Sequence, residues 1–161
     1  MNYCTYKYFR IVLLLGTTGL STLSCDSKAQ PGNRNDETIQ FADVNYLKEV
    51  ADQAYQNKEF DKAKSFYSKL ISLDSLSGEY YYRRGVSYAH FYDFEKAIED
   101  YSRSVELSYR VHDSYYNMGI IYYIMFMNDS KAIDCFKKAL EADPNSKDAA
   151  EMLESIYQKV N

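Results

Sequence analysis

Hydrophobic and polar positions along residues 43–161 follow a pattern that returns about every 34 residues. Three segments align on a small residue with an aromatic residue four places later, and they read EFDKAKSFYSKLISLDS from Glu59, DFEKAIEDYSRSVELSY from Asp93 and NDSKAIDCFKKALEADP from Asn128. The small residues Ala63 and Ala97 are 34 positions apart, and Ala97 and Ala132 are 35 apart. A period of this length is typical of repeat architectures, in which each unit buries its apolar face against its neighbours.

A second set of small residues precedes the first with the same period. Its members are Ala51 in VADQAY, Gly85 in RGVSYA and Gly119 in MGIIYY. The pattern resembles the tetratricopeptide repeat family, whose unit of about 34 residues is a helix–turn–helix. The family's small residue at position eight and its second-helix alanine both match when the repeats are placed at 44–77, 78–111 and 112–146.

The resemblance implies an all-α fold, a right-handed α-solenoid of three helix–turn–helix repeats. Residues 147–160 follow the third repeat with an apolar stripe of Ala150, Leu153, Ile156 and Tyr157 opposite polar residues. We expect this segment to be the capping helix that closes the exposed end of a solenoid. The domain is therefore predicted to span residues 43–161.

Two details of the repeats need a physical reason. Glycine inside a helix costs about 1 kcal/mol relative to alanine, so Gly85 and Gly119 are expected where the partner helix packs closely. The third repeat also has one extra residue between Tyr122 and Asn128, which the family pattern does not explain.

The first 24 residues have the layout of a secretory signal. Lys7 and Arg10 precede the apolar run from Ile11 to Ser24, which is shorter than the roughly 20 residues that a membrane-spanning helix needs. Ser24-Cys25 resembles the end of the lipobox of bacterial lipoproteins, although Thr22 and Leu23 stand in the opposite order to the usual one. The alternative is an ordinary secretory signal with a chance cysteine.

On the lipoprotein interpretation, acyl chains on Cys25 hold the protein at a membrane of the bacterial cell envelope, in a leaflet that the sequence does not specify. The polar segment 25–42 is then a flexible tether between lipid and domain. Loss of Lys7 and Arg10 leaves 17 basic residues against 23 acidic ones, a balance that argues against nucleic acid as a partner. Only Cys135 remains as a free thiol, so no disulfide forms within one mature chain.

The sequence offers little for catalysis. Its two histidines, His90 and His112, lie outside any metal-binding or nucleophile motif, and no phosphate-binding glycine loop is present. We therefore predict a protein that is not an enzyme and has no cofactor and no metal site. An enzyme would require activity that depends on His90 or His112.

The family resemblance places partner binding on the concave groove formed by the first helices. The residues expected there are Lys48, Asp52, Tyr55, Tyr82, Val86, His90, Tyr116, Ile120, Tyr123 and Ile124. Some relatives hold a partner's C-terminal carboxylate with Lys, Asn and Arg at these positions, but only Lys48 is of that kind here. Tyrosine and apolar side chains instead suit an amphipathic helix or an extended peptide. The alternative is that these tyrosines pack on one another or on the capping helix.

These observations predict a non-catalytic scaffold or adaptor, tethered to an envelope membrane, that binds a partner peptide or helix. The alternative function is an accessory subunit of a complex that handles peptidoglycan or other glycans, with tyrosine rings stacked on sugars. The uncharged run MGIIYYIMFM, residues 118–127, is too short to cross a bilayer and is expected to be the first helix of the third repeat.

Overall fold

The computed structural model describes residues 34–160, with side chains described for residues 43–159. This part of the chain is all-helical and contains seven α-helices with one π-helical segment. The elements are α1 (Arg34–Gln56), α2 (Phe60–Leu73), α3 (Gly78–His90), α4 (Phe94–Glu106), α5 (Val111–Ile120), η1 (Ile121–Met125), α6 (Asp129–Ala142) and α7 (Lys147–Val160). None of these helices is both long enough and apolar enough to cross a membrane.

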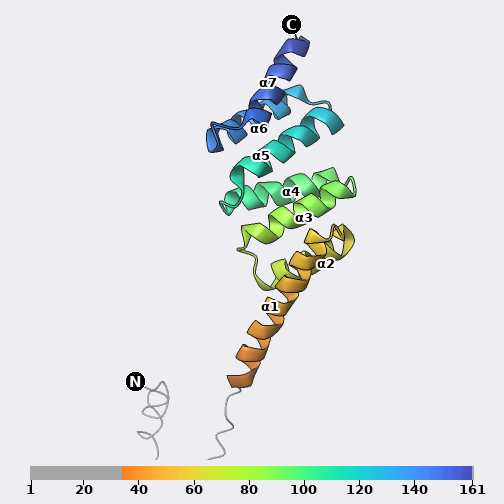
Figure 1. Cartoon of the computed structure of the whole chain (residues 1–161), viewed down its shortest axis with the longest axis vertical. Helices are drawn as coiled ribbons and strands as arrows, with labels where there is room; N and C mark the ends of the chain where they lie inside the picture. Colours follow the sequence, from red (N-terminus) through yellow and green to blue (C-terminus); the bar gives the residue numbers. More distant parts are fainter. Residues whose placement is uncertain (1–33, 161) are drawn as a thin grey trace, which may run out of the picture. The chain divides into compact units, whose positions relative to one another are not determined.

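Helices that follow one another in the chain lie side by side, as Figure 1 shows. The pairs α1–α2, α3–α4 and α5–α6 form three hairpins, α3 packs on α2, α5 packs on α4, and α7 packs on α6. Helix α7 begins at Lys147, the first residue of the predicted cap. The predicted all-α solenoid of three hairpins and a capping helix is confirmed.

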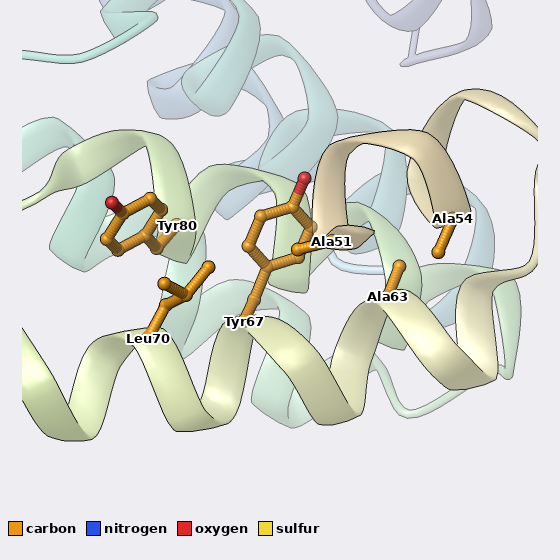
Figure 2. Close-up of a cluster of buried hydrophobic side chains, with 6 residues drawn as sticks. All are labelled: Ala51, Ala54, Ala63, Tyr67, Leu70 and Tyr80. Carbon is orange, nitrogen blue, oxygen red and sulfur yellow. The ribbon is translucent and has the colours of Figure 1, made fainter. Parts of the chain in front are cut away.

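Small residues let the two helices of the first hairpin approach, and larger residues fill the remaining space. The buried cluster in Figure 2 consists of Ala51 and Ala54 of α1, Ala63, Tyr67 and Leu70 of α2, and Tyr80 of α3. The ring of Tyr80 stacks on that of Tyr67 with centroids 6.2 Å apart. A residue of the second repeat therefore completes the core of the first, which is how a solenoid gains its stability.

The expected close contacts at glycine are confirmed. A Cβ atom on Gly119 would lie 2.7 Å from the ring of Phe136 on α6, and one on Gly85 would lie 3.1 Å from the ring of Tyr101 on α4. Because Phe136 is fully buried, its ring cannot easily move away. Glycine is thus required at position 119, whereas at position 85 a Cβ would make a tight contact that the ring of Tyr101 must yield to.

Helix α1 begins at Arg34, nine residues earlier than the predicted domain start at residue 43. The prediction of a flexible tether through residue 42 is therefore wrong for residues 34–42. Once the docked part of a helix is nucleated, each further residue adds one hydrogen bond, so extension is easier than a new start. The remaining tether residues 25–33, Cys25 and the signal segment lie outside the described residues.

The extra residue of the third repeat is held in the π-helical segment η1. The amide of Phe126 donates to the carbonyl of Ile121, five residues back, with an N–O distance of 3.2 Å. A π-helical turn accommodates one additional residue without ending the helix, and such turns are frequent at functional sites. It also brings Phe126 and Met127 into the turn that leads to α6.

Candidate functional site

The ten predicted groove residues all lie on the first helices of their hairpins. Lys48, Asp52 and Tyr55 are on α1, Tyr82, Val86 and His90 on α3, Tyr116 and Ile120 on α5, and Tyr123 and Ile124 on η1. His90 and Ile124 are exposed, and the other eight are half-buried. We call these ten residues, with Arg83 and Arg110, the first-helix face.

A network of charged groups joins the first and second repeats at one end of this face. Asp52 accepts hydrogen bonds from Lys48 (2.7 Å) and from the hydroxyl of Tyr67 (2.8 Å). Arg83 of α3 also donates to Asp52, with a distance of 2.5 Å between its Nη1 atom and Oδ1. One carboxylate thus links three helices.

Glu79 completes this network with a second carboxylate. It lies 2.7 Å from Nη2 of Arg83 and 3.2 Å from Nζ of Lys48, so two cations face two anions. Partial burial acts to raise the pKa of Asp52, but hydrogen bonds from Lys48 and Tyr67 and the charge of Arg83 outweigh it and lower the pKa. The network neutralises its own charge, so Lys48 is not a free cation for a partner's carboxylate.

The centre of the first-helix face contains a small cavity of about 190 Å³. Three tyrosines and two arginines line it: Tyr55, Tyr82, Arg83, Tyr109 and Arg110. The guanidinium of Arg83 lies 5.4 Å from the ring centroid of Tyr55, and that of Arg110 lies 5.7 Å from the ring of Tyr82. Burial raises the pKa of Tyr82 to about 12.

Sequence reasoning missed Arg83, Tyr109 and Arg110 at this cavity. The family positions used to place the groove fall only on first helices, whereas Tyr109 and Arg110 belong to the connection between repeats two and three. Arg110 has a left-handed backbone with φ of 43°, and its side chain pairs with Asp113 at 2.7 Å. A larger polar cleft of about 460 Å³ lies along α1 and is lined by Asn45, Lys48, Glu49, Asp52, Gln53 and Gln56.

The third-repeat part of the face is apolar and partly covered by the end of the solenoid. Tyr116, Ile120 and Tyr123 pack against a buried cluster of Ala132, Phe136, Leu153 and Ile156 from α6 and α7. Lys159 of α7 places its Nζ 5.3 Å from the ring of Tyr123. In this part of the face the tyrosines therefore pack on the end of the solenoid, as the alternative interpretation expected. Ile124 is not covered in this way and is 51% exposed.

His112 takes part in a hydrogen-bonded row with a structural role. Its Nδ1 lies 2.9 Å from Asp113, and its Nε2 lies 2.8 Å from the hydroxyl of Ser146. That hydroxyl also accepts from the amide of Ala149 in the first turn of α7, so Ser146 caps this helix. The row fixes the start of α7 to α5. In the part of the chain with described side chains, no three metal-ligating residues gather at one point.

Stacked antiparallel helical hairpins with small residues at their contacts define the class of α-solenoid repeat proteins. The family model of the tetratricopeptide repeat matches residues 78–110 and 112–146, the second and third hairpins. These repeats belong to the tetratricopeptide repeat family. Such repeats are generally non-catalytic modules for protein–protein interaction, so the domain is of a protein-binding type.

Two relatives have similar sequences over part of their length. The chain is 34% identical to Translocon at the outer membrane of chloroplasts 64 of Pisum sativum over 114 residues. This aligned region covers 69% of this chain and 19% of that protein. It is 31% identical over 107 residues to Photosystem I assembly protein Ycf3 of Synechococcus sp. (strain CC9605), which covers 64% of this chain and 62% of that one. The chain thus spans about a fifth and about three fifths of these relatives.

Solved structures share the fold at lower identity. The first TPR of Spaghetti (RPAP3) bound to HSP90 peptide SRMEEVD has a TM-score of 0.63 and 22% identity, covering 73% of this chain and 92% of that one. The Yersinia enterocolitica type III secretion chaperone SycD, in complex with a peptide of the translocator YopD, has a TM-score of 0.67 and 17% identity, covering 74% and 96%.

Proposed function

We propose that this protein is a non-catalytic adaptor that binds a peptide or helix of a partner on its first-helix face and is held at an envelope membrane by lipid on Cys25. The observation that carries the first part is the central cavity, where two guanidiniums lie over tyrosine rings. Arginine and tyrosine are the side chains that contribute most at protein interfaces. The RPAP3 and SycD domains of the same fold each have a bound peptide in the structures compared above.

The charges of the face indicate what the partner segment is like. The cleft along α1 is polar, and the network around Asp52 is electrically balanced. The opposite end, at η1, presents the exposed side chain of Ile124. A partner segment that is polar at one end, apolar at the other and without a large net charge is complementary to this arrangement of polar cleft and apolar end. Such a partner gains affinity from apolar burial more than from long-range attraction.

The lipid anchor rests on the sequence around Cys25 alone. An acylated cysteine with two or three acyl chains binds membranes stably, whereas a single chain does not. The test is fractionation and mass spectrometry of the full chain expressed in a bacterium. We expect the wild type in the membrane fraction with the mass of an acylated cysteine, and Cys25→Ser in the aqueous fraction. An unmodified Cys25 would refute the anchor.

Crosslinking and pull-down from membranes tests the first-helix face. Arg110→Asn removes a guanidinium from the cavity and keeps a residue that tolerates a left-handed backbone, and Ile124→Asp puts charge at the exposed apolar end. Arg103→Gln, which removes a cation paired with Glu106 on α4, is the matched control. The two face variants are expected to lose proteins that the wild type and control retain, with unchanged circular dichroism. Recovery of the same proteins by all four would refute binding on this face.

A further inference from the structure

Large apolar side chains stand exposed in the turns within the second and third hairpins. In the second turn, Tyr92 is 76% exposed and Phe91 47%. At the third, Met125 ends η1 and Phe126 and Met127 follow it in the turn, with exposures of 45%, 41% and 83%. We call these five residues the turn edge. A soluble protein rarely leaves so many consecutive apolar side chains in water unless they contact something.

Ring contacts join the two turns into one surface. The rings of Tyr92 and Phe94 are 5.9 Å apart, those of Phe94 and Phe126 are 6.5 Å apart, and Phe126 reaches Tyr122 at 5.9 Å. An open cleft of about 330 Å³ adjoins these rings and is lined by Glu95, Ile98, Tyr122, Phe126, Asn128 and Lys131. The turn edge is thus continuous across two repeats.

The backbone of the turns does not require these side chains. Tyr92 and Met127 have left-handed φ angles of 61° and 49°, a region that disfavours large side chains and prefers glycine or asparagine. Lys58 occupies the equivalent place in the first hairpin with φ of 61° and is polar. A polar residue therefore fits this turn, so the bulky apolar residues at the other two tips are unfavourable both in conformation and in exposure.

Charge around the turn edge is close to balanced. Lys96 is paired with Asp93 at 2.6 Å, and Lys131 lies with its Nζ 5.1 Å from the ring of Tyr122. The whole chain, by contrast, has a net charge of −4. Such an edge is neither repelled by a zwitterionic lipid surface nor dependent on anionic lipids. Lysine and tyrosine side chains are also favoured at the boundary between headgroups and acyl chains, because each has an apolar part and a polar end.

We propose that the turn edge inserts into the headgroup region of a lipid bilayer, as a second membrane contact beside the lipid on Cys25. This inference rests on the proposed anchor for its geometry. From Cys25 to Arg34 the chain advances nine residues, which span at most about 30 Å. Helix α1, with 23 residues, is about 35 Å long and ends beside the first turn.

The tether joins α1 at Arg34, the end of the helix away from the turn edge, and its reach of at most about 30 Å is shorter than α1. The lipid and the turn edge can therefore contact one bilayer together only when α1 is inclined to the membrane surface and not perpendicular to it. At such short range a weak apolar contact acts at high effective concentration and adds to the attachment that the lipid already gives. A bilayer accepts side chains that protrude from turn tips without requiring a matching shape. A protein partner at the same place would need complementary packing, and the test below separates the two.

The chain has no tryptophan, so a single introduced tryptophan reports its own surroundings. Tyr92→Trp places the probe on the turn edge, and Tyr46→Trp places it on α1 at a tyrosine of similar exposure, 70%. Both full-length lipidated chains are reconstituted with phosphatidylcholine vesicles that contain brominated acyl chains. The probe at position 92 is expected to shift to shorter wavelength and be quenched, while the probe at 46 is not. Equal behaviour of the two probes would overturn the proposal and leave the turn edge to a protein partner.

A second measurement is independent of the anchor. Unlipidated Cys25→Ser chains carrying each probe are titrated with the same vesicles, and Phe126→Asp is added to the Tyr92→Trp chain. The aspartate is expected to weaken vesicle binding about tenfold or more, because it removes one large apolar side chain from the lipid contact. Tyr46→Asp, which removes an exposed ring elsewhere, is expected to leave binding unchanged. If Cys25 proves unmodified while this titration succeeds, only the anchor fails; if Phe126→Asp has no effect, the turn edge is not a membrane contact.

Discussion

The junction between repeats one and two and the junction between repeat three and the capping helix have the same architecture and different chemistry. At the first, Arg83 of α3 binds Asp52 of α1 and lies 3.1 Å from the hydroxyl of Tyr67 of α2. At the second, the fully buried side chains of Phe136 and Ile156 pack together between α6 and α7. The first junction adds half-exposed charges to the apolar stacking of Tyr80 on Tyr67, whereas the second is held by apolar burial.

This difference shows what the repeat pattern determines. The period places small residues where helices cross, and that is sufficient for hairpins to stack. It leaves open how neighbouring repeats are joined, because charge pairs and apolar rings both satisfy the geometry. We expect the apolar junction to contribute more to the free energy of unfolding, and its contribution should not depend on salt concentration. The contribution of the charged junction should be smaller and should change with salt and pH.

The largest effect is expected from Phe136→Ala at the apolar junction. Removing a fully buried ring leaves a cavity between α5, α6 and α7, and such changes cost about 3–5 kcal/mol of unfolding free energy. Urea unfolding followed by circular dichroism measures it. Tyr157→Ala, which truncates a partly exposed ring on α7, is the control and is expected to cost much less. Equal losses for the two variants would contradict the assigned role of Phe136.

Gly119→Leu crowds the ring of Phe136 from α5, the other helix of the third hairpin. Because a Cβ at this position would lie within 3.0 Å of the Phe136 ring, a leucine overpacks the hairpin by roughly 1–3 kcal/mol. The double variant with Phe136→Leu, which frees space, is expected to lose less than the sum of the two single changes. Strict additivity in this cycle would mean that the two residues do not meet.

At the charged junction, Arg83→Met is expected to cost about 1–2 kcal/mol. It leaves Asp52 and Glu79 with Lys48 as their remaining cation, and the value is modest because the network is partly open to water. The loss should shrink in 1 M salt, which screens the charges, whereas the loss in Phe136→Ala should not. A salt-independent cost would show that Arg83 acts by packing alone.

The sequence predicted the hairpins and the cap because small residues recur at fixed positions, as Ala97 and Gly119 illustrate. It could not predict the Arg83–Asp52 contact, since these residues are 31 positions apart and neither belongs to the repeat consensus. Nor could it show that α7 covers part of Tyr116 and Ile120, because the docking of the cap depends on three-dimensional packing and not on the period. Membership of a first helix was predictable, whereas accessibility to a partner was not.

The smallest effect expected is the pH dependence of the charged junction. The pKa of Asp52 is lower in the folded protein than its ordinary value of 3.8, so its stabilising contribution is present above about pH 4 and is lost as the pH falls through the folded pKa. In Asp52→Asn the free energy of unfolding should therefore fall less steeply than in the wild type as the pH drops from about 4 to about 2. The difference should be less than about 1 kcal/mol, since the group is partly exposed. Asp134→Asn, at an exposed position of α6, should leave the fall as steep as in the wild type. The measurement is the urea midpoint at each pH, and an identical fall for wild type and Asp52→Asn would show that the network contributes nothing at this junction.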